Sequence, residues 1–255
     1  MLILLPPSEG KAQRRRGSVL NLANLSHPTL TEPRRQVLAA AAAVSATAEA
    51  AQILKVSPAL ASDIARNTEL GTTPTLPAAQ LYRGVLYEAL DLGSLDPGSR
   101  RRASARIAIS SAMFGVVRLT DRIPPYRLSM GVNLPGIGPL ARFWREPLAT
   151  ALAGVPRRGL IIDTRSSTYA ACWAPHPGSS QAQRWVQVRV PGATHMAKHT
   201  RGLVARALVQ QLHDAQSRSE LIPLLADRFD VELQPPTDLR SPWILSAVPR
   251  PRAIQ

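Results

Sequence analysis

Three short, largely apolar runs restrict the fold of this chain more than any other feature. They are MLILL at 1–5, RIAIS at 106–110 and LIID at 160–163. A continuous apolar run of this length, bounded by prolines or polar residues, is typical of a strand that is buried on both faces. The runs therefore predict central strands of a sheet, and they leave parallel and antiparallel pairing undecided.

Further strands and several helices are expected between and after these runs. The sequence YRLSMGVNL at 126–134 is interpreted as a strand, and WVQVRV at 185–190 alternates as a strand does. Two late extended segments cover 230–236 and 242–248. Helical periodicity predicts helices over 33–54, 57–70, 77–95, 139–152, 195–215 and 219–229.

This order of elements predicts a mixed α/β (α+β) fold in which helices flank a central mixed sheet. The stretch DPGSRRRASAR at 96–106 is interpreted as a basic segment between elements. There is no internal repeat and no linker rich in Gly and Ser. We therefore expect a single domain over 1–255, with a frayed tail at about 249–255.

The chain is strongly basic, with 31 Lys and Arg residues against 17 Asp and Glu, a formal net charge of +14 and a pI near 11.4. Such a charge attracts polyanions, so double-stranded DNA or another polyanion is the first partner to test. A coding bias toward Arg and Ala would produce the same charge without any partner. Composition alone does not separate these two explanations.

Cysteine content and hydropathy indicate the compartment. Cys172 is the single cysteine, which excludes an intramolecular disulfide and favours a reducing environment. The first apolar run ends before Pro6, and a run of this length is too short for the core of a signal peptide. The weakly polar run at 37–54 is mostly alanine, which is typical of a packed helix and not of a membrane span. We expect a soluble, cytoplasmic protein with no membrane partner.

Each of the three apolar runs is followed by a cluster of polar residues. In open α/β sheets, ligands bind outside the carboxyl ends of the strands, where loops present polar groups. If the strands are parallel neighbours, one concavity is surrounded by Ser8, Glu9, Lys11, Ser110, Ser111, Asp163, Thr164, Ser166 and Tyr169. The alternative is that each Ser or Thr only caps a helix.

Lysine is scarce, because 28 of the 31 basic side chains are arginine and only Lys11, Lys55 and Lys198 are lysine. Such a chain keeps a lysine where a compact charge, or an amine that can lose its proton, is required. Lys198 and Arg201 are three residues apart on a predicted helix, so they share a face near its amino end and attract anions. Lys55 is interpreted as an ordinary surface charge.

The segment LPGIGPLAR at 134–142 resembles the hairpin of helix-hairpin-helix motifs, in which backbone N–H groups meet a DNA phosphate. The residues expected to contact the DNA backbone are Gly136, Ile137, Gly138 and Arg142. The alternative is a glycine turn that precedes a helix from Pro139.

Several catalytic and metal-binding motifs are missing from the sequence. The five histidines have no metal-ligand spacing, G-x-S-x-G does not occur, and SEGK lacks the phosphate-binding pattern G-x-x-x-x-G-K-[ST]. We therefore expect neither a metal site nor a cofactor.

Five stretches stand in a recognisable order and spacing: MLILLPPSEGK, LYRGVLYEAL, ISSAMFGVVRLTDRIPPYRLSMGVNLP, FWREPL and AKHTRGLVARALV. In that order they resemble the YaaA family of peroxide stress-resistance proteins, nearly from end to end. The resemblance implies an unusual single-domain α/β fold in a cytoplasmic protein. It further implies protection of DNA during peroxide stress, limitation of available iron, and binding of double-stranded DNA through a basic cleft with a helix-hairpin-helix-like element.

The family motifs also mark candidate functional positions. By matching motif these are Ser8, Glu9, Gly10, Lys11, Tyr126, Arg127, Gly131, Lys198, Arg201 and Gly202. The chain departs from the family pattern at DTRSSTY (163–169), at GATHMAKHTR (192–201) and at Val117–Leu119. These departures point to specialisation in the middle of the predicted pocket.

Two functions from different classes are consistent with the sequence. The first is a non-enzymatic protein that binds double-stranded DNA without strong sequence preference and protects against peroxide. The alternative is an enzyme acting on an anionic small molecule, a nucleotide or nucleobase derivative, with Glu9 and Lys11 transferring protons. The anion would then be held by residues among Ser8, Gly10, Lys11, Tyr126, Arg127, Ser166, Lys198 and Arg201.

Overall fold

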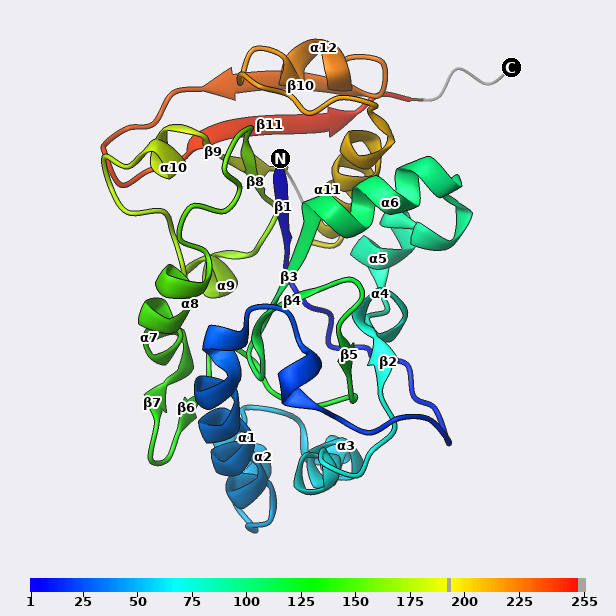
Figure 1. The fold of residues 1–255 in the computed structure, drawn as a ribbon, viewed down its shortest axis with the longest axis vertical. Coiled ribbons are helices and arrows are strands. Elements are labelled where there is room, and N and C mark those ends of the chain that lie inside the picture. Colours follow the sequence, from blue (N-terminus) through cyan, green and yellow to red (C-terminus); the bar gives the residue numbers. More distant parts are fainter. Residues whose placement is uncertain (192–193, 252–255) are drawn as a thin grey trace.

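A seven-stranded mixed sheet forms the centre of the protein (Figure 1), which we describe from a computed structural model over residues 1–191 and 194–251. In sheet order its strands are β10 (Phe229–Gln234), β11 (Trp243–Pro249), β9 (Trp185–Arg189), β8 (Ile161–Asp163), β1 (Leu2–Leu5), β3 (Ile107–Ser111) and β4 (Gly115–Arg118). The five inner strands are parallel, and β10 and β4 are antiparallel edges. The prediction of a mixed α/β fold around a mixed sheet is confirmed.

The three apolar runs are adjacent strands, with β1 between β3 and β8. Ile3 is opposite Ile107 on one side and Ile162 on the other, in parallel register. All residues of the three strands are buried, which explains why the runs are continuously apolar rather than alternating. Their carboxyl ends consequently lie at the same edge of the sheet.

Helices surround the sheet and also extend beyond that edge. In Figure 1, α1, α2 and α3 lie past the carboxyl end of β1, while α5, α6 and α11 pack together beside the sheet. The helices are α1 (Thr31–Ser45), α2 (Ala50–Ile53), α3 (Ala61–Ala65), α4 (Ala78–Leu81), α5 (Val85–Leu90), α6 (Pro97–Arg106), α7 (Leu140–Phe143), α8 (Arg145–Ala151), α9 (Ser167–Ala170), α10 (Ser180–Gln183), α11 (Thr194–Gln210) and α12 (Leu221–Leu225). Short 3₁₀ turns occur at η1 (Leu22–Asn24), η2 (Pro28–Leu30), η3 (Pro58–Leu60), η4 (Arg66–Glu69) and η5 (Leu92–Ser94).

The expected strand at 126–134 is mostly irregular loop, so that prediction was wrong. Only β6 (Asn133–Leu134) is extended and paired within it. The side chain of Asn67 replaces a neighbouring strand, because its amide accepts from the Arg127 N–H at 2.9 Å and donates to the Arg127 carbonyl at 2.8 Å. A buried backbone whose polar groups are satisfied in this way needs no strand partner.

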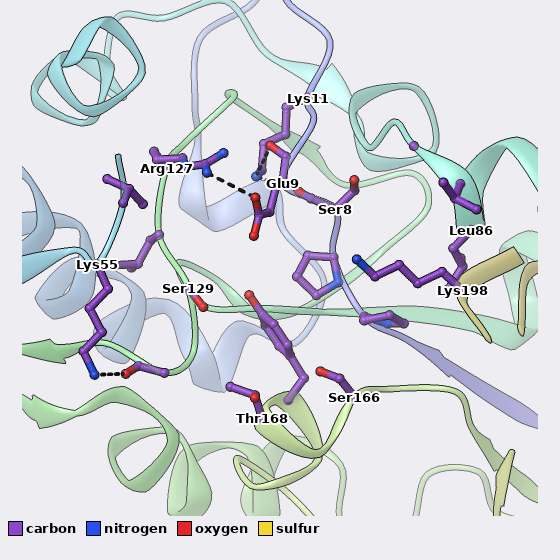
Figure 2. Close-up of a pocket in the computed structure, with 18 of the residues that line it drawn as sticks. Ser8, Glu9, Lys11, Lys55, Leu86, Arg127, Ser129, Ser166, Thr168 and Lys198 are labelled. Carbon is purple, nitrogen blue, oxygen red and sulfur yellow. Dashed lines mark hydrogen bonds and ion pairs between the residues drawn. The ribbon is translucent and has the colours of Figure 1, made fainter. Parts of the chain in front are cut away.

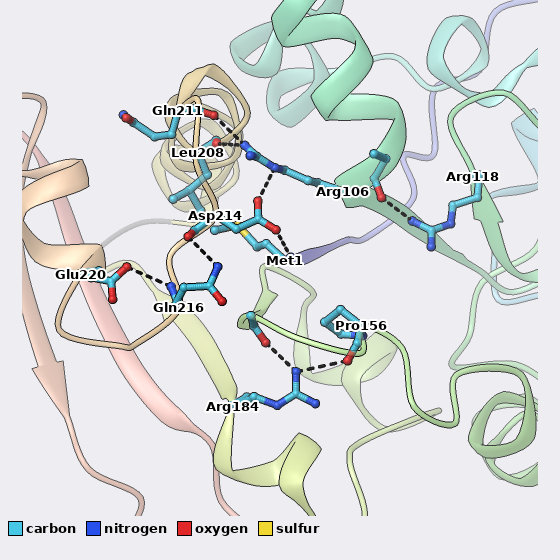
Figure 3. Close-up of polar contacts among 12 residues, drawn as sticks. Met1, Arg106, Arg118, Pro156, Arg184, Leu208, Gln211, Asp214, Gln216 and Glu220 are labelled. Carbon is cyan, nitrogen blue, oxygen red and sulfur yellow. Dashed lines mark hydrogen bonds and ion pairs between the residues drawn. The ribbon is translucent and has the colours of Figure 1, made fainter.

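The basic segment at 96–106 is a helix, α6, which sequence analysis missed. Asp96 caps it by accepting from the Ser99 N–H at 3.0 Å, and Pro97 occupies its first turn. Arg106 donates to the carbonyls of Leu208 and Gln211 at the end of α11, at 2.8 and 2.9 Å (Figure 3). Its arginines therefore satisfy carbonyls that a helix end leaves free.

An ion-pair cluster joins α6 to the start of the chain. Asp214 pairs with Arg106 Nε at 2.6 Å and with the amino group of Met1 (Figure 3). The cluster lies at the amino end of β1, opposite the edge where the polar clusters follow the strands. It fixes β1 and α11 relative to α6.

The glycine segment at 134–142 is a β-hairpin and not part of a helix-hairpin-helix. β6 pairs antiparallel with β7 (Gly138–Pro139), and the turn uses positive φ at Gly136 (+79°) and Gly138 (+86°). Within the described residues the element before this turn is a strand, so the first helix of the motif is missing. Ile137 is half-buried and Arg142 is exposed at the start of α7. The alternative interpretation, a glycine turn before a helix, describes the segment correctly.

Two other boundaries differ from expectation. The helix expected at 77–95 breaks between α4 and α5 at Gly84, and the one at 33–54 breaks between α1 and α2.

A second small sheet pairs β2 (Leu76–Pro77) with β5 (Arg122–Ile123), and the edge strand β4 was not predicted. At the other end of the chain, the ladder extends to Pro249, and the rest of the expected frayed tail at 252–255 is outside the described residues.

Among the residues that the structure describes, no helix is both long enough and apolar enough to cross a bilayer.

Gly202 sets how closely α11 approaches α5. A Cβ atom there would lie 2.2 Å from the carbonyl oxygen of Leu86 and 2.8 Å from Cβ of Ala89. Both contacts are far inside van der Waals distance, and the first is to backbone that cannot rotate away. The two helices can approach this closely only if residue 202 is glycine.

We therefore expect Gly202→Ala to lower the free energy of unfolding by about 2 kcal/mol or more, even though alanine favours a helix. Urea denaturation measures the change. Gly71→Ala is the matched control, because a Cβ at Gly71 meets nothing within 4 Å, and its effect should stay within about 0.5 kcal/mol. Equal effects of the two substitutions would contradict this account of the helix contact.

Candidate functional site

A cavity of about 780 Å³ opens at the carboxyl edge of the central strands (Figure 2). Its wall is built from segments far apart in the sequence, which the parallel sheet and the helices beyond it bring together. The segments that contribute lining residues are 6–11, 55–60, 84–87, 127–132, 166–169 and 198–201.

The segment after β1 forms one side of this cavity. Ser8, Glu9 and Lys11 line it, whereas Gly10 turns its carbonyl toward the Arg83 N–H at 3.0 Å. A Cβ at Gly84, whose φ is +110°, would lie 3.0 Å from Ser8 Oγ. The SEGK sequence is therefore a cavity wall packed against the loop before α5, and Gly10 acts through its backbone.

Lys11 lies between an aromatic surface and the cavity. Its Nζ is 4.3 Å from the ring centre of Tyr126, and it donates to the Ser8 carbonyl at 2.8 Å. The same amine lies 3.4 Å from the backbone carbonyl of Glu9, and the Glu9 carboxylate forms an ion pair with Arg127 at 3.2 Å (Figure 2). An amine, a carboxylate and a guanidinium thus meet at one end of the cavity.

The pKa of Lys11 is lowered to about 7, first by burial and second by the positive charge of Arg127. The carboxylates of Glu9 and Asp63 act in the opposite direction and raise it. A substantial fraction of the Lys11 side chain is therefore the neutral amine at neutral pH. Lysines with this property serve as proton acceptors or nucleophiles in enzymes.

Tyr126 supports Lys11 and does not line the cavity. Its hydroxyl is bonded to Ser111 Oγ at 2.8 Å and to the Tyr82 hydroxyl at 3.0 Å. Burial raises the pKa of Tyr126 well above its usual value, so the phenol keeps its proton. The ring face toward Lys11 is its contribution to the site, rather than a contact with ligand.

A buried ion pair positions the part of the cavity wall that residues 166–169 form. Asp163 and Arg165 form a bidentate pair with distances of 2.9 and 2.7 Å, and Trp185 Nε1 donates to the same carboxylate. Arg165 also donates to the carbonyls of Tyr169 and Trp173, which fixes α9. This arrangement places Ser166, Thr168 and Tyr169 on the cavity.

Four residues of the predicted concavity are structural instead. Asp163 is committed to Arg165, Thr164 Oγ1 donates to the Leu4 carbonyl at 2.8 Å, and Ser111 bonds Tyr126. Ser110 is buried in β3. None of the four lines the cavity. Ser110, Ser111 and Asp163 belong to the strands themselves and are buried, whereas the residues that line the cavity come after the strand ends.

All three lysines of the chain line this one cavity. Lys198 projects from α11 toward its middle, and Lys55 lies at its edge with Nζ 3.2 Å from the Gly131 carbonyl (Figure 2). Lys55 is exposed, as expected of a surface charge, and it also belongs to the rim of the cavity.

Arg201 completes the cationic lining. Its Nε is buried and has no hydrogen-bond partner among the described residues. Burial also lowers the pKa of Arg201. A guanidinium remains charged in proteins, and a buried donor without a partner carries an energetic cost. Five basic side chains line the cavity against the single carboxylate of Glu9. An anion is the ligand that this charge distribution favours.

The side chains of the described part of the chain do not form a metal centre. No group of three or more His, Cys, Asp or Glu residues is placed to hold an ion there. His195 belongs to α11, and its side chain is outside what the structure describes.

Fold and cavity together define a mixed α/β protein with a cavity lined by cationic side chains at the carboxyl ends of its parallel strands. The sequence model of the peroxide stress protein YaaA family matches residues 1–232, and the chain belongs to this family. The motifs that carried the resemblance, SEGK, PYRLSMG and K-x-x-RG, contribute residues to the cavity wall or to its support.

Curated relatives cover almost the same length. A UPF0246 protein of Streptomyces coelicolor is 42% identical, over 97% of this chain and 98% of its own. UPF0246 proteins of Corynebacterium efficiens and Corynebacterium glutamicum are 39% and 35% identical, over 87% and 88% of this chain and 90% and 91% of theirs.

The charges around Lys11 give a test of its environment. Arg127→Ala removes a cation and should raise the pKa of Lys11, whereas Glu9→Gln removes an anion and should lower it. NMR titration of ¹³C-labelled lysine side chains measures both, because three lysines give a simple spectrum that Lys→Arg variants assign. Arg142→Ala is the control and should leave the titration unchanged. Shifts in the same direction for both variants would contradict the geometry described above.

Proposed function

We propose that this protein binds an anionic small molecule, of the nucleotide or nucleobase-derivative class, in the cavity at the strand ends. The observation that carries the proposal is the convergence of all three lysines with Arg127 and Arg201 on one cavity. Lys198 and Arg201 are one helical turn apart and supply the cations for the anionic group. The cavity size is within the range of small-molecule sites.

The surroundings of Lys11 support chemistry on the bound molecule. Duplex binding needs only contacts to phosphates and does not need a neutral amine next to a carboxylate. In this proposal Glu9 and Lys11 exchange protons with a ligand that Lys198 and Arg201 hold. Tyr169 lines the same cavity, and burial raises the pKa of its phenol, so the phenol stays protonated and can donate a hydrogen bond.

Binding of double-stranded DNA is the second candidate, and a specific observation favours it. Arg14, Arg15 and Arg16 are consecutive and exposed in the loop that follows Lys11. Together with the net charge of +14, these arginines form a surface that attracts phosphates without reading sequence. In this function the protein would cover DNA during peroxide stress.

The small-molecule function predicts that inorganic pyrophosphate binds and that Arg201→Ala weakens its binding about tenfold or more. A charge-assisted hydrogen bond to a partly buried guanidinium is lost in that variant. Lys198→Ala should act in the same direction, and isothermal titration calorimetry measures each dissociation constant. Arg142→Ala, which removes an exposed arginine away from the cavity, should have no effect. The proposal fails if pyrophosphate does not bind, or if all three variants behave alike.

The DNA function predicts a steep salt dependence. Neutralising about 6 to 10 phosphates reduces affinity about 10³ to 10⁵-fold between 50 and 200 mM salt. Replacing Arg14, Arg15 and Arg16 together by alanine should reduce the salt slope while leaving pyrophosphate affinity unchanged. Fluorescence anisotropy with a short duplex gives both quantities. A flat salt response would rule this function out.

A further inference from the structure

Lys11 combines three properties that a lysine needs for covalent chemistry with a carbonyl compound. Its side chain lines the cavity, the carboxylate of Glu9 that can carry a proton lines the same cavity, and cations for a second group of the ligand are also part of its lining. Lys55 and Lys198 line the cavity too, but Lys55 is turned toward the Gly131 carbonyl and Lys198 belongs to the anion-binding pair.

We propose that Lys11 forms an imine with the aldehyde or ketone group of an anionic carbonyl compound bound in the cavity. The inference rests on the proposed small-molecule function and names its substrate class. The anionic group of the ligand would lie at Lys198 and Arg201, and its carbonyl carbon at Nζ of Lys11. Nothing in this assignment requires a metal, an oxidant or a reductant.

The covalent step is balanced by the groups on the cavity wall. The amine lone pair of Lys11 forms the N–C bond as the carbonyl π electrons move to oxygen, which takes a proton and gives a carbinolamine. Nitrogen then loses a proton, the hydroxyl takes up a proton and leaves as water as the C=N bond forms, and the nitrogen of the resulting iminium ion loses the second amine proton to give the imine. Amine and carbonyl thus give imine and water, with the carboxylate of Glu9 in the cavity lining to move the protons and the protonated phenol of Tyr169 to donate a hydrogen bond to the carbonyl oxygen.

The charged and titratable groups around Lys11 favour its neutral form enough for this step. Burial and Arg127 bring the pKa of Lys11 to about 7, against Glu9 from its own segment and Asp63 from α3. The rings of Tyr82 and Tyr126 lie next to the amine at 5.8 and 4.3 Å, and their phenols stay protonated because burial raises both pKa values. Lys198 faces the same space from α11.

Position and charge together explain why this amine differs from a surface lysine. The Lys11 backbone is fixed by a bridge to Tyr82, and the Ala12 N–H donates to the Leu81 carbonyl at 2.7 Å. Its Nζ is bonded to the Ser8 carbonyl, which directs the amine along the cavity wall. The nucleophile is therefore held in place before a ligand arrives, which reduces the entropic cost of reaction.

Borohydride trapping with pyridoxal 5′-phosphate tests the proposal on the full-length protein. The probe carries an aldehyde and a phosphate, and reduction makes the adduct permanent. We expect one adduct per chain, located on Lys11 by mass spectrometry of peptides, with a rate that rises through about pH 7. Lys11→Met and Lys11→Arg should abolish the adduct, while Arg142→Ala, away from the cavity, should retain it. Labelling that falls on Lys55 or Lys198 in the wild-type protein would overturn the assignment.

Two related compounds separate the covalent step from anion binding. Pyridoxal lacks the phosphate, and its labelling of Lys11 should be about tenfold slower at equal concentration, a difference that Arg201→Ala should remove. Pyridoxine 5′-phosphate lacks the aldehyde and should protect Lys11 from labelling. Its calorimetric binding should persist in Lys11→Met, which shows that the variant is folded.

The outcomes distinguish the two proposals. If pyridoxine 5′-phosphate and pyrophosphate bind through Lys198 and Arg201 but no adduct forms on Lys11, imine formation is overturned and the small-molecule function stands. If neither compound binds and no adduct forms, both fail. Equal labelling by pyridoxal and its phosphate would overturn the assignment of an anionic substrate.

Discussion

The structure depends on the parallel pairing of β1 with both β3 and β8. This pairing buries the first residues of the chain on all sides and brings three distant segments to one edge of the sheet. A shift of one residue in either pairing would turn every side chain of the shifted strand to the opposite face of the sheet. The cavity exists because the loops after these strands, and the helices beyond them, are held to one geometry by that register.

Around this edge, the protein uses buried polar contacts to shape the cavity wall. Asp163 and Arg165 are completely or almost completely buried, and such pairs contribute little net stability compared with apolar packing. Their value is positional, because Arg165 also fixes the two carbonyls that orient α9. On the other wall, Asn67 does the same for the loop that carries Arg127. Directional hydrogen bonds thus place the side chains that apolar packing alone could not orient.

Sequence reasoning located the strands of the core and the segments that line the cavity, because burial on both faces produces continuous apolar runs and strand ends meet at one edge. It failed where a side chain, and not a neighbouring strand, forms hydrogen bonds to the backbone, as Asn67 does at Arg127. It also failed where arginines of one helix donate to the free carbonyls at the end of another, as those of α6 do. These contacts join residues far apart in the sequence and leave no periodic pattern. That the exposed Lys55 also lines the cavity follows only from the fold, which brings the turn after α2 to the cavity rim.

The anchoring of the 126–131 loop by Asn67 has a consequence for how this protein can diversify. The loop supplies Arg127, Ser129 and Gly131 to the cavity, but it shares no ladder with the central sheet. Substitutions in it can therefore alter what the cavity accepts without disturbing strand register, as long as Asn67 keeps its two hydrogen bonds to the backbone of Arg127. Ligand preference and foldability are in this way encoded in separate parts of the chain, so related proteins can share the scaffold while differing in what they bind.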